Sequence, residues 1–192
     1  YQSDALTEED RASVNALLQG LTHADAALGR LVDYFKDCDE PVMIVFYGDH
    51  LPAMHLSNTE TLYSKLGLVP TMDSLSWTPE ELKRMLSTDY LIWTNYEQEA
   101  QDDCEESSIM LGANVAYRAG LKLSPFDDWL NHYASNDYLM SRPRLVVDAA
   151  GNASTDAPAE YAQTLQVHQL IEYDLIYGKQ TLLRYMSVNA KN

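Results

Sequence analysis

Several features that would define a simple functional class are absent from this 192-residue sequence. Its two cysteines, Cys38 and Cys104, are too few for a disulfide framework, and they could form one bridge or stay free. No CxxC motif and no Cys/His spacing predicts a zinc site. No apolar run reaches the roughly 18 residues that a membrane span needs, so we expect no membrane segment in this chain. The first residues do not have the pattern of a signal peptide.

Positive charge is also scarce. The sequence has 13 Lys and Arg residues against 29 Asp and Glu residues, which gives a formal net charge of -16 at pH 7. A surface this acidic repels the phosphates of nucleic acids and disfavours docking on anionic lipid. We therefore predict no nucleic-acid partner. The acidity by itself identifies no ligand, because most carboxylates on such a chain form a solvated surface.

What remains is the composition of an ordinary globular protein. Hydrophobic residues make up 46% of the chain, and its length suits one domain with a sizeable core. The chain begins with Tyr1 and not with Met. We therefore expect residues 1–192 to be part of a longer protein.

The apolar spacing and the end signals predict alternating helices and strands. Gly20 lies inside the first helical stretch, where it could divide the helix in two or merely weaken it. Thr78 and Ser124 are placed as helix caps, each followed by proline, and Gly120 is placed to close a helix. The predicted helices are 8–37, 78–86, 107–120, 124–134 and 158–180; the predicted strands are 42–47 and 89–96; a small hairpin is predicted within 143–155.

The stretch "VMIVFYGDHLP", residues 42–52, indicates the fold class. A strand that is apolar at every position follows an amphipathic helix and a turn at Pro41, as in the second half of a βαβ unit. Continuous apolar strands are typical of sheets covered on both faces. We therefore predict an α/β fold, a three-layer sandwich with a mainly parallel sheet. Residues 42–47 would form a central strand, and residues 89–96 another strand of the same sheet.

The same stretch predicts a metal site, because ligands of such sheets lie beyond the carboxyl ends of the strands. Asp49 offers a carboxylate oxygen and His50 an imidazole nitrogen, which together suit an ion such as Mn²⁺ or Zn²⁺. Both can reach one ion only if the strand has ended, which Pro52 favours. His55 could also approach an ion. The alternative is that Asp49 caps the next turn and His50 makes an ordinary hydrogen bond.

Three stretches together resemble a known family, the lipoteichoic acid synthase and phosphoglycerol transferase group of sulfatase-like proteins in the alkaline phosphatase superfamily. "VMIVFYGDHLP" resembles the family's strand with a metal-binding Asp-His pair. The other two stretches are "HADAALGRLVDYF", residues 23–35, and "IEYDLIYGKQTLL", residues 171–183. Their order and spacing resemble the C-terminal part of the family's catalytic domain, over essentially the whole chain.

The resemblance implies a transferase or hydrolase that acts on phosphoglycerol or sulfate esters of the cell envelope. It implies an alkaline phosphatase or sulfatase-like fold and a membrane-anchored parent protein that works on the extracellular face of the membrane. Asp49 and His50 would be two ligands of the catalytic ion, most often Mn²⁺, with Mg²⁺, Ca²⁺ or Zn²⁺ as alternatives.

The family's threonine nucleophile and glutamate ligand have no counterpart in this chain, and by the resemblance they would lie upstream of Tyr1. We therefore expect the chain alone to be inactive. A sulfatase-type hydrolase would differ from a phosphoglycerol transferase mainly in its nucleophile. A non-catalytic or partner-binding domain would keep the fold without the chemistry.

Overall fold

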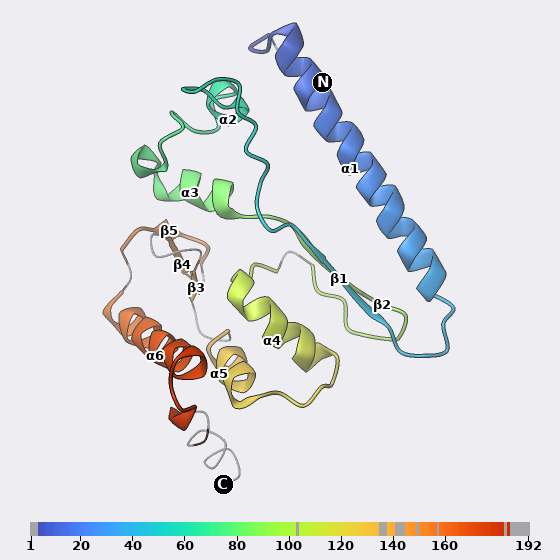
Figure 1. Ribbon diagram of the computed structural model, residues 1–192, viewed down its shortest axis with the longest axis vertical. Helices are drawn as coiled ribbons and strands as arrows, with labels where there is room; N and C mark the ends of the chain where they lie inside the picture. The colour runs from blue at the N-terminus through green and yellow to red at the C-terminus, as the bar shows by residue number, and fades with distance from the viewer. Residues whose placement is uncertain are drawn as a thin grey trace. The chain divides into compact units, whose positions relative to one another are not determined.

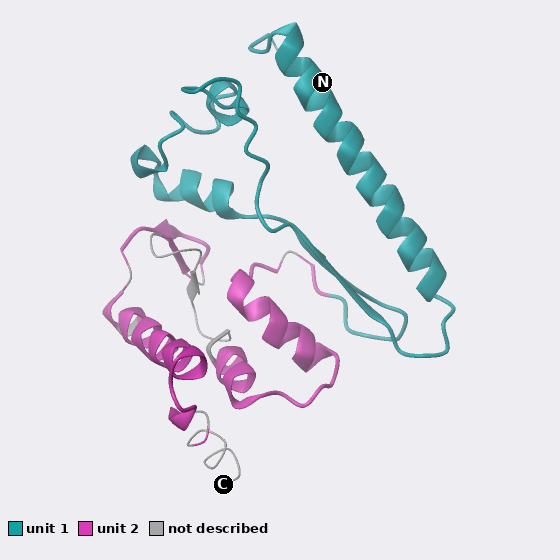
Figure 2. Cartoon of the chain, in the orientation of Figure 1, with its two compact units in different colours: residues 1–100 teal, residues 101–192 magenta. Residues whose placement is uncertain are grey.

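The computed structural model describes residues 4–102, 104–134, 138–140, 145–148, 150–156, 158–182 and 184. They fall into two compact units, residues 1–100 and residues 101–192, shown in Figure 2. The first unit contains α1 (Glu8–Phe35), β1 (Met43–Tyr47), α2 (Leu62–Lys65), a 3₁₀ turn (Ser74–Ser76), α3 (Pro79–Leu86) and β2 (Tyr90–Thr94), labelled in Figure 1. The second contains α4 (Ser108–Arg118), α5 (Pro125–Ala134), β3 (Tyr138–Met140), β4 (Val146–Asp148), β5 (Ala153–Ser154) and α6 (Ala159–Ile176).

Helix α1 begins at a capping box. The Thr7 hydroxyl accepts a hydrogen bond from the backbone N–H of Asp10, and the Asp10 carboxylate accepts one from the N–H of Thr7. Acidic residues in the first turn also suit the positive end of the helix dipole. The helix continues through Gly20 without a break, so the glycine does not divide it.

The core of the first unit holds the beginning of α1 against α2. Leu6, Val14 and Leu62 are buried together, with Met54 and Leu66 packed against them. The later apolar positions of α1 are partly in solvent, and the exposed fractions reach 45% for Leu18 and 57% for Leu21. The predicted apolar spacing is therefore present, but only its N-terminal part is buried by described residues.

An ion pair ties the same two helices together. Lys65 Nζ lies 2.6 Å from Asp10 Oδ2, and both side chains are largely shielded from solvent. The hydrogen bond from Lys65, together with those from Thr7, lowers the pKa of Asp10 from 3.8 to about 2. Asp10 thus fixes the start of α1 and anchors α2 at once.

Strands β1 and β2 form one two-stranded antiparallel ribbon, in which Met43 pairs with Thr94 and Tyr47 with Tyr90. Both predicted strands are confirmed as members of one sheet. The mainly parallel three-layer sandwich is not seen in the described residues, where all strand pairings are antiparallel and β1 pairs with β2 alone. The predicted central strand is not seen either, because Phe46 and Tyr47 are 47% and 59% exposed. An apolar run also carries no signal for strand direction, which depends on how the chain returns after residue 48.

The remaining elements follow their local signals closely. Thr78 caps α3 with Pro79 at its first turn, and the Ser124 hydroxyl accepts the N–H of Asp127 at the start of α5. Gly120 closes α4 with a positive φ of 67°. In the predicted hairpin region β4 pairs with β5, while residues 143, 144 and 149 lie outside the described residues. Helix α6 ends at Ile176, earlier than predicted.

Candidate functional site

The candidate site is the turn that follows β1. The N–H of Gly48 donates to the carbonyl of Asp89 at 3.2 Å, which continues the ribbon by one bond. The chain then leaves the ribbon at Asp49 and His50, whose side chains are 80% and 73% exposed. The strand has therefore ended before Asp49 and His50, as a shared ion would require.

The two predicted ligands converge. His50 Nε2 lies 3.5 Å from Asp49 Oδ2. Two ligand atoms that each lie about 2.1 Å from one ion are about 3.0 Å apart at a right angle and about 3.4 Å apart at a tetrahedral angle. The observed separation is close to this range, so the two atoms fit a shared divalent ion with little movement.

A hydrogen bond selects the tautomer of the neutral imidazole. His50 Nδ1 lies 2.9 Å from the carbonyl oxygen of Leu51. A carbonyl can only accept, so in the neutral ring Nδ1 carries the proton and Nε2 carries the lone pair. Metal-binding histidines are commonly oriented in this way by a backbone carbonyl. In this tautomer the lone pair is on Nε2, the nitrogen that lies 3.5 Å from Asp49 Oδ2.

The alternative interpretation also has a basis in the geometry. Asp49 Oδ1 accepts the backbone N–H of His50 at 2.9 Å, so one oxygen of the carboxylate does serve the turn. A protonated His50 could pair directly with Oδ2. Because both side chains are mostly in solvent, such an ion pair would add little stability. Binding of an ion therefore has little existing interaction to displace.

Two hydroxyl groups that sequence reasoning missed hold the turn at its ends. Thr88 Oγ1 donates to the carbonyl of Gly48 at 2.6 Å, and Tyr63 Oη donates to the carbonyl of Pro52 at 2.6 Å. Burial raises the pKa of Tyr63, which keeps its hydroxyl protonated. The only sequence signal was that Thr88 directly precedes a predicted strand.

Other candidate residues do not join this pair. His55 is exposed, and its backbone forms an isolated bridge with Thr61. Within the part of the chain that the structure describes, no group of three or more His, Cys, Asp or Glu side chains could hold a metal ion. Cys38 and Cys104 are both free and exposed. No described helix is long and apolar enough to cross a membrane.

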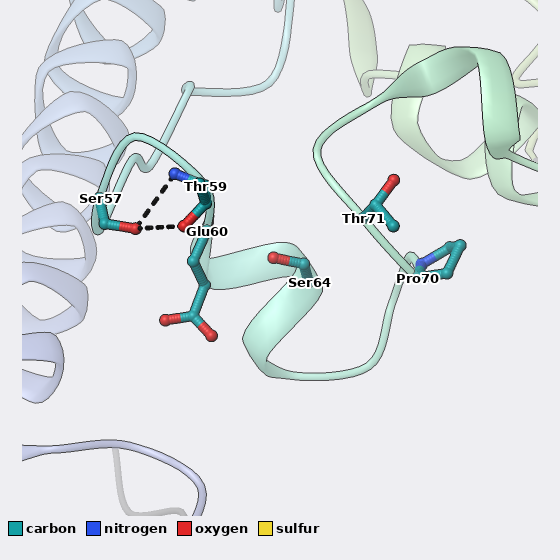
Figure 3. Close-up of a pocket in the computed structure, with 6 residues that line it drawn as sticks. All are labelled: Ser57, Thr59, Glu60, Ser64, Pro70 and Thr71. Atoms are coloured by element: carbon teal, nitrogen blue, oxygen red, sulfur yellow. Dashed lines mark hydrogen bonds between the residues drawn. The ribbon is translucent and has the colours of Figure 1, made fainter.

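A separate hollow of about 380 Å³ lies between the loop before α2 and the chain after it. Figure 3 shows its lining, and the hydroxyls of Ser57 and Thr59 face each other at 3.4 Å. Asp49 and His50 are not among the lining residues. Hydroxyl groups dominate the wall, which is formed by Ser57, Thr59, Glu60, Ser64, Pro70 and Thr71.

Comparison with known proteins places this geometry in context. A curated relative, the putative cyclic beta-1,2-glucan modification protein of Rhizobium meliloti (strain 1021), is 25% identical in an alignment of 181 residues that covers 91% of this chain. The solved structure of Streptococcus pyogenes phosphoglycerol transferase GacH, in complex with sn-glycerol-1-phosphate, aligns with 96% of this chain at a TM-score of 0.65 and 21% identity. The chain spans 27% of the first protein and 40% of the second.

The structural likeness establishes the fold. The chain has the fold of the corresponding part of a sulfatase-like or alkaline phosphatase-like domain, although its described strands alone do not form the complete predicted sandwich. The profile of the Sulfatase family matches residues 1–121, which include α1, the β1–β2 ribbon and the Asp49–His50 turn. The chain therefore belongs to the sulfatase family.

Proposed function

We propose that Asp49 and His50 are two ligands of a divalent ion in a metal-dependent phosphoglycerol transferase or a related phosphoester or sulfate ester hydrolase. The observation that carries the proposal is the 3.5 Å separation of Nε2 and Oδ2, with the Nε2 lone pair left free. A carboxylate and an imidazole suit Mn²⁺ or Zn²⁺, and the family resemblance makes Mn²⁺ the first choice. Mg²⁺, Ca²⁺ and Zn²⁺ are the alternatives.

Such an ion would make a hydroxyl nucleophile more acidic and neutralise charge on phosphoryl oxygens. The contribution of this chain is to present the Asp49 carboxylate together with a neutral His50 imidazole whose proton is on Nδ1. We propose that the remaining ligands and the nucleophile come from other parts of the protein. This agrees with the 40% share of the transferase structure that the chain covers.

The substrate that we propose is a cell-envelope polymer bearing phosphoglycerol or sulfate groups, reached on the extracellular face of the membrane. The structural relative was solved with sn-glycerol-1-phosphate, and the curated relative is named for glucan modification. A glycan acceptor that receives a phosphoglycerol group is consistent with both names.

The test is a Mn²⁺ titration followed by NMR, because paramagnetic Mn²⁺ broadens signals close to it. The signals of residues 48–52 should broaden first, and His50→Ala and Asp49→Ala should abolish this effect. The buffer should contain about 0.15 M salt, which screens loose association of the ion with the acidic surface. Broadening should also weaken at acidic pH, because a protonated imidazole cannot bind the ion.

The exposed His23 on α1 provides a matched control. His23→Ala should bind Mn²⁺ like the unmodified chain. If His50→Ala leaves the broadening at residues 48–52 unchanged, the proposed metal role is wrong. The strand end would then be only a turn, and a non-catalytic role of the domain would be favoured.

A further inference from the structure

The turn that carries Asp49 and His50 has an unusual arrangement of backbone hydrogen bonds. Three of its carbonyl groups each accept a bond from a side chain. These are Gly48 with Thr88 at 2.6 Å, Leu51 with His50 at 2.9 Å, and Pro52 with Tyr63 at 2.6 Å. The turn is thus held at both ends and in the middle, although it is outside regular secondary structure.

Thr88 also determines how closely the backbone packs at Gly48. A Cβ atom added at Gly48 would lie 3.0 Å from Cβ of Thr88 and 3.3 Å from its Cγ2 methyl. Thr88 therefore does two things with one side chain: its carbon atoms set the distance to the turn, and its hydroxyl sets the direction of the Gly48 carbonyl. The orientation of the following residue, Asp49, depends on that peptide.

Tyr63 fixes the other end of the turn, and it lies on a helix that packs in the core of the first unit. It lies in α2 directly after Leu62, which is only 6% exposed in the core with Leu6 and Val14. A tyrosine ring has few rotatable bonds, so its hydroxyl is placed with little loss of entropy. The Pro52 carbonyl is thereby connected to the packed core of the unit.

The side chains of Asp49 and His50 lack comparable support. They are largely in solvent, and among the described residues they contact only each other and backbone atoms of the same turn. Their convergence must therefore be set by the backbone. The backbone of the turn is set by Thr88 and Tyr63.

We propose that Thr88 and Tyr63 are positioning residues of the ion site. They do not touch the ion, and they keep Asp49 Oδ2 and His50 Nε2 converged by fixing the two ends of the turn. This inference rests on the proposed function and extends it to residues outside the ligand set. Groups that hydrogen-bond metal ligands directly typically change metal affinity by 10- to 100-fold when they are removed. Thr88 and Tyr63 act through the neighbouring backbone, so we expect an effect at the lower end of this range.

The experiment compares Thr88→Val with Thr88→Ser. Valine keeps the shape of threonine but removes the hydroxyl, while serine keeps the hydroxyl. We expect Thr88→Val to weaken Mn²⁺ binding about tenfold, and Thr88→Ser to restore most of the affinity. Tyr63→Phe should weaken binding in the same direction. Affinity is measured in the whole chain by broadening of the residue 48–52 signals, at a temperature where each variant is folded.

Two matched controls test whether the effect requires contact with the turn or follows from the loss of any hydroxyl group. Ser87 is next to Thr88, but its hydroxyl donates to the carbonyl of Lys83 in α3. Tyr34 is 77% exposed on α1. Among the described residues, neither side chain forms a hydrogen bond with the turn, so Ser87→Ala and Tyr34→Phe should leave Mn²⁺ affinity unchanged.

A second readout needs no metal. The ¹⁵N shifts of the His50 ring report which nitrogen carries the proton, and the unmodified chain should show the Nδ1–H form. Thr88→Val should mix in the other tautomer, because the Gly48 carbonyl is no longer held and the turn that carries the Leu51 carbonyl can move away from Nδ1. A role in fold stability alone would lower the unfolding midpoint without changing the tautomer.

The outcomes distinguish the two proposals. If Mn²⁺ binding depends on His50 but is equal in Thr88→Val, the positioning role is wrong and the proposed function stands. If no His50-dependent binding occurs, the proposed function fails. In that case the ¹⁵N shifts of the His50 ring test the positioning role by themselves. A change of tautomer in Thr88→Val supports positioning of the imidazole, and an unchanged tautomer overturns it.

Discussion

The two ends of the β1–β2 ribbon differ in what their polar side chains do: at one end they bind backbone groups, and at the other end they face solvent. At the end where β1 begins, Asn95 Oδ1 accepts the N–H of Val42 at 2.8 Å. Its Nδ2 lies 2.9 to 3.2 Å from the carbonyls of Phe35, Cys38 and Glu40. At the end where β1 finishes, the polar side chains of Asp49 and His50 face solvent.

The difference shows where this unit derives stability and where it exposes chemical groups. Asn95 uses its whole amide to satisfy backbone groups, so nothing of it remains for a ligand; its two N–H groups are shared among three carbonyls. At the other end the backbone is satisfied by Thr88 and Tyr63, which leaves the carboxylate oxygen Oδ2 and the Nε2 lone pair available. Variants at the two ends should therefore have different consequences.

The largest effect on stability is expected at the end of the ribbon where β1 begins. Asn95→Ala should lower the free energy of unfolding by about 2 kcal/mol, because several backbone groups lose a partner at once and only partly regain it from water. Urea unfolding, followed at the amide signals of β1, measures the change. Mn²⁺ broadening at the other end should persist while the chain is folded.

An exposed asparagine provides the comparison. Asn58→Ala should change stability by less than about 0.5 kcal/mol, as usual for surface positions. Equal unfolding midpoints for Asn95→Ala and Asn58→Ala would show that the two ends of the ribbon do not differ in this way.

A smaller effect is expected from Gly48→Ala. The added methyl group meets Thr88 Cβ at 3.0 Å, so the turn must shift, at a cost of about 1 kcal/mol. Mn²⁺ affinity should fall as well. In a Thr88→Gly background the added methyl has room, and the extra cost of Gly48→Ala should disappear.

Gly29 is the matched control, because nothing lies within 4 Å of a Cβ added there. It lies in the middle of α1, so Gly29→Ala should stabilise the chain by up to about 1 kcal/mol. Opposite signs for the two glycine variants would support the packing argument. A stabilising Gly48→Ala would contradict it.

The smallest effect on stability concerns the start of α1, which packs in the same core as Leu62, the neighbour of Tyr63. The pKa of Asp10 is lowered to about 2 by Lys65 and Thr7, so its contribution to stability is present above pH 3.8 and is lost as the pH falls toward 2. Asp10→Asn and Lys65→Met should both flatten the loss of stability in this range. Urea midpoints measured between pH 2 and 5 test this.

The double variant of Asp10 and Lys65 checks the cause. If the two residues act as one pair, combining Asp10→Asn with Lys65→Met should flatten the pH dependence no more than Asp10→Asn alone, while Lys65→Met alone should leave the part that comes from Thr7. Fully additive effects would mean that the two groups act independently. Mn²⁺ binding at Asp49 and His50 should change little in any of these variants.

Local signals in the sequence predicted the elements well. The caps at Thr78 and Ser124, the closing Gly120 and the two apolar strands all occur as predicted. These features depend on neighbours a few residues apart, which a sequence displays directly. The antiparallel pairing of the strands depends on contacts between residues about 50 positions apart, for which the apolar pattern has no signal.

The candidate site was predictable only in part. Asp49 and His50 could be found because they follow an apolar strand, and their convergence follows from the predicted end of that strand. Thr88, Tyr63 and Asn95 act through hydroxyl and amide bonds to backbone atoms far away in the sequence. A threonine before a strand or an asparagine after one is common, so neither position attracts notice without coordinates.

The outer edge of β1 has a consequence for the behaviour of the chain in solution. The bonds at Gly48 and Val42 turn the even-numbered residues toward β2, so the backbone groups of Met43, Val45 and Tyr47 point away from it. Among the described residues, no other strand pairs with this edge. An uncharged edge without proline is a template for further strands. Wherever it is uncovered, concentrated solutions should be prone to fibrillar self-association, and a single lysine at position 45 should improve solubility.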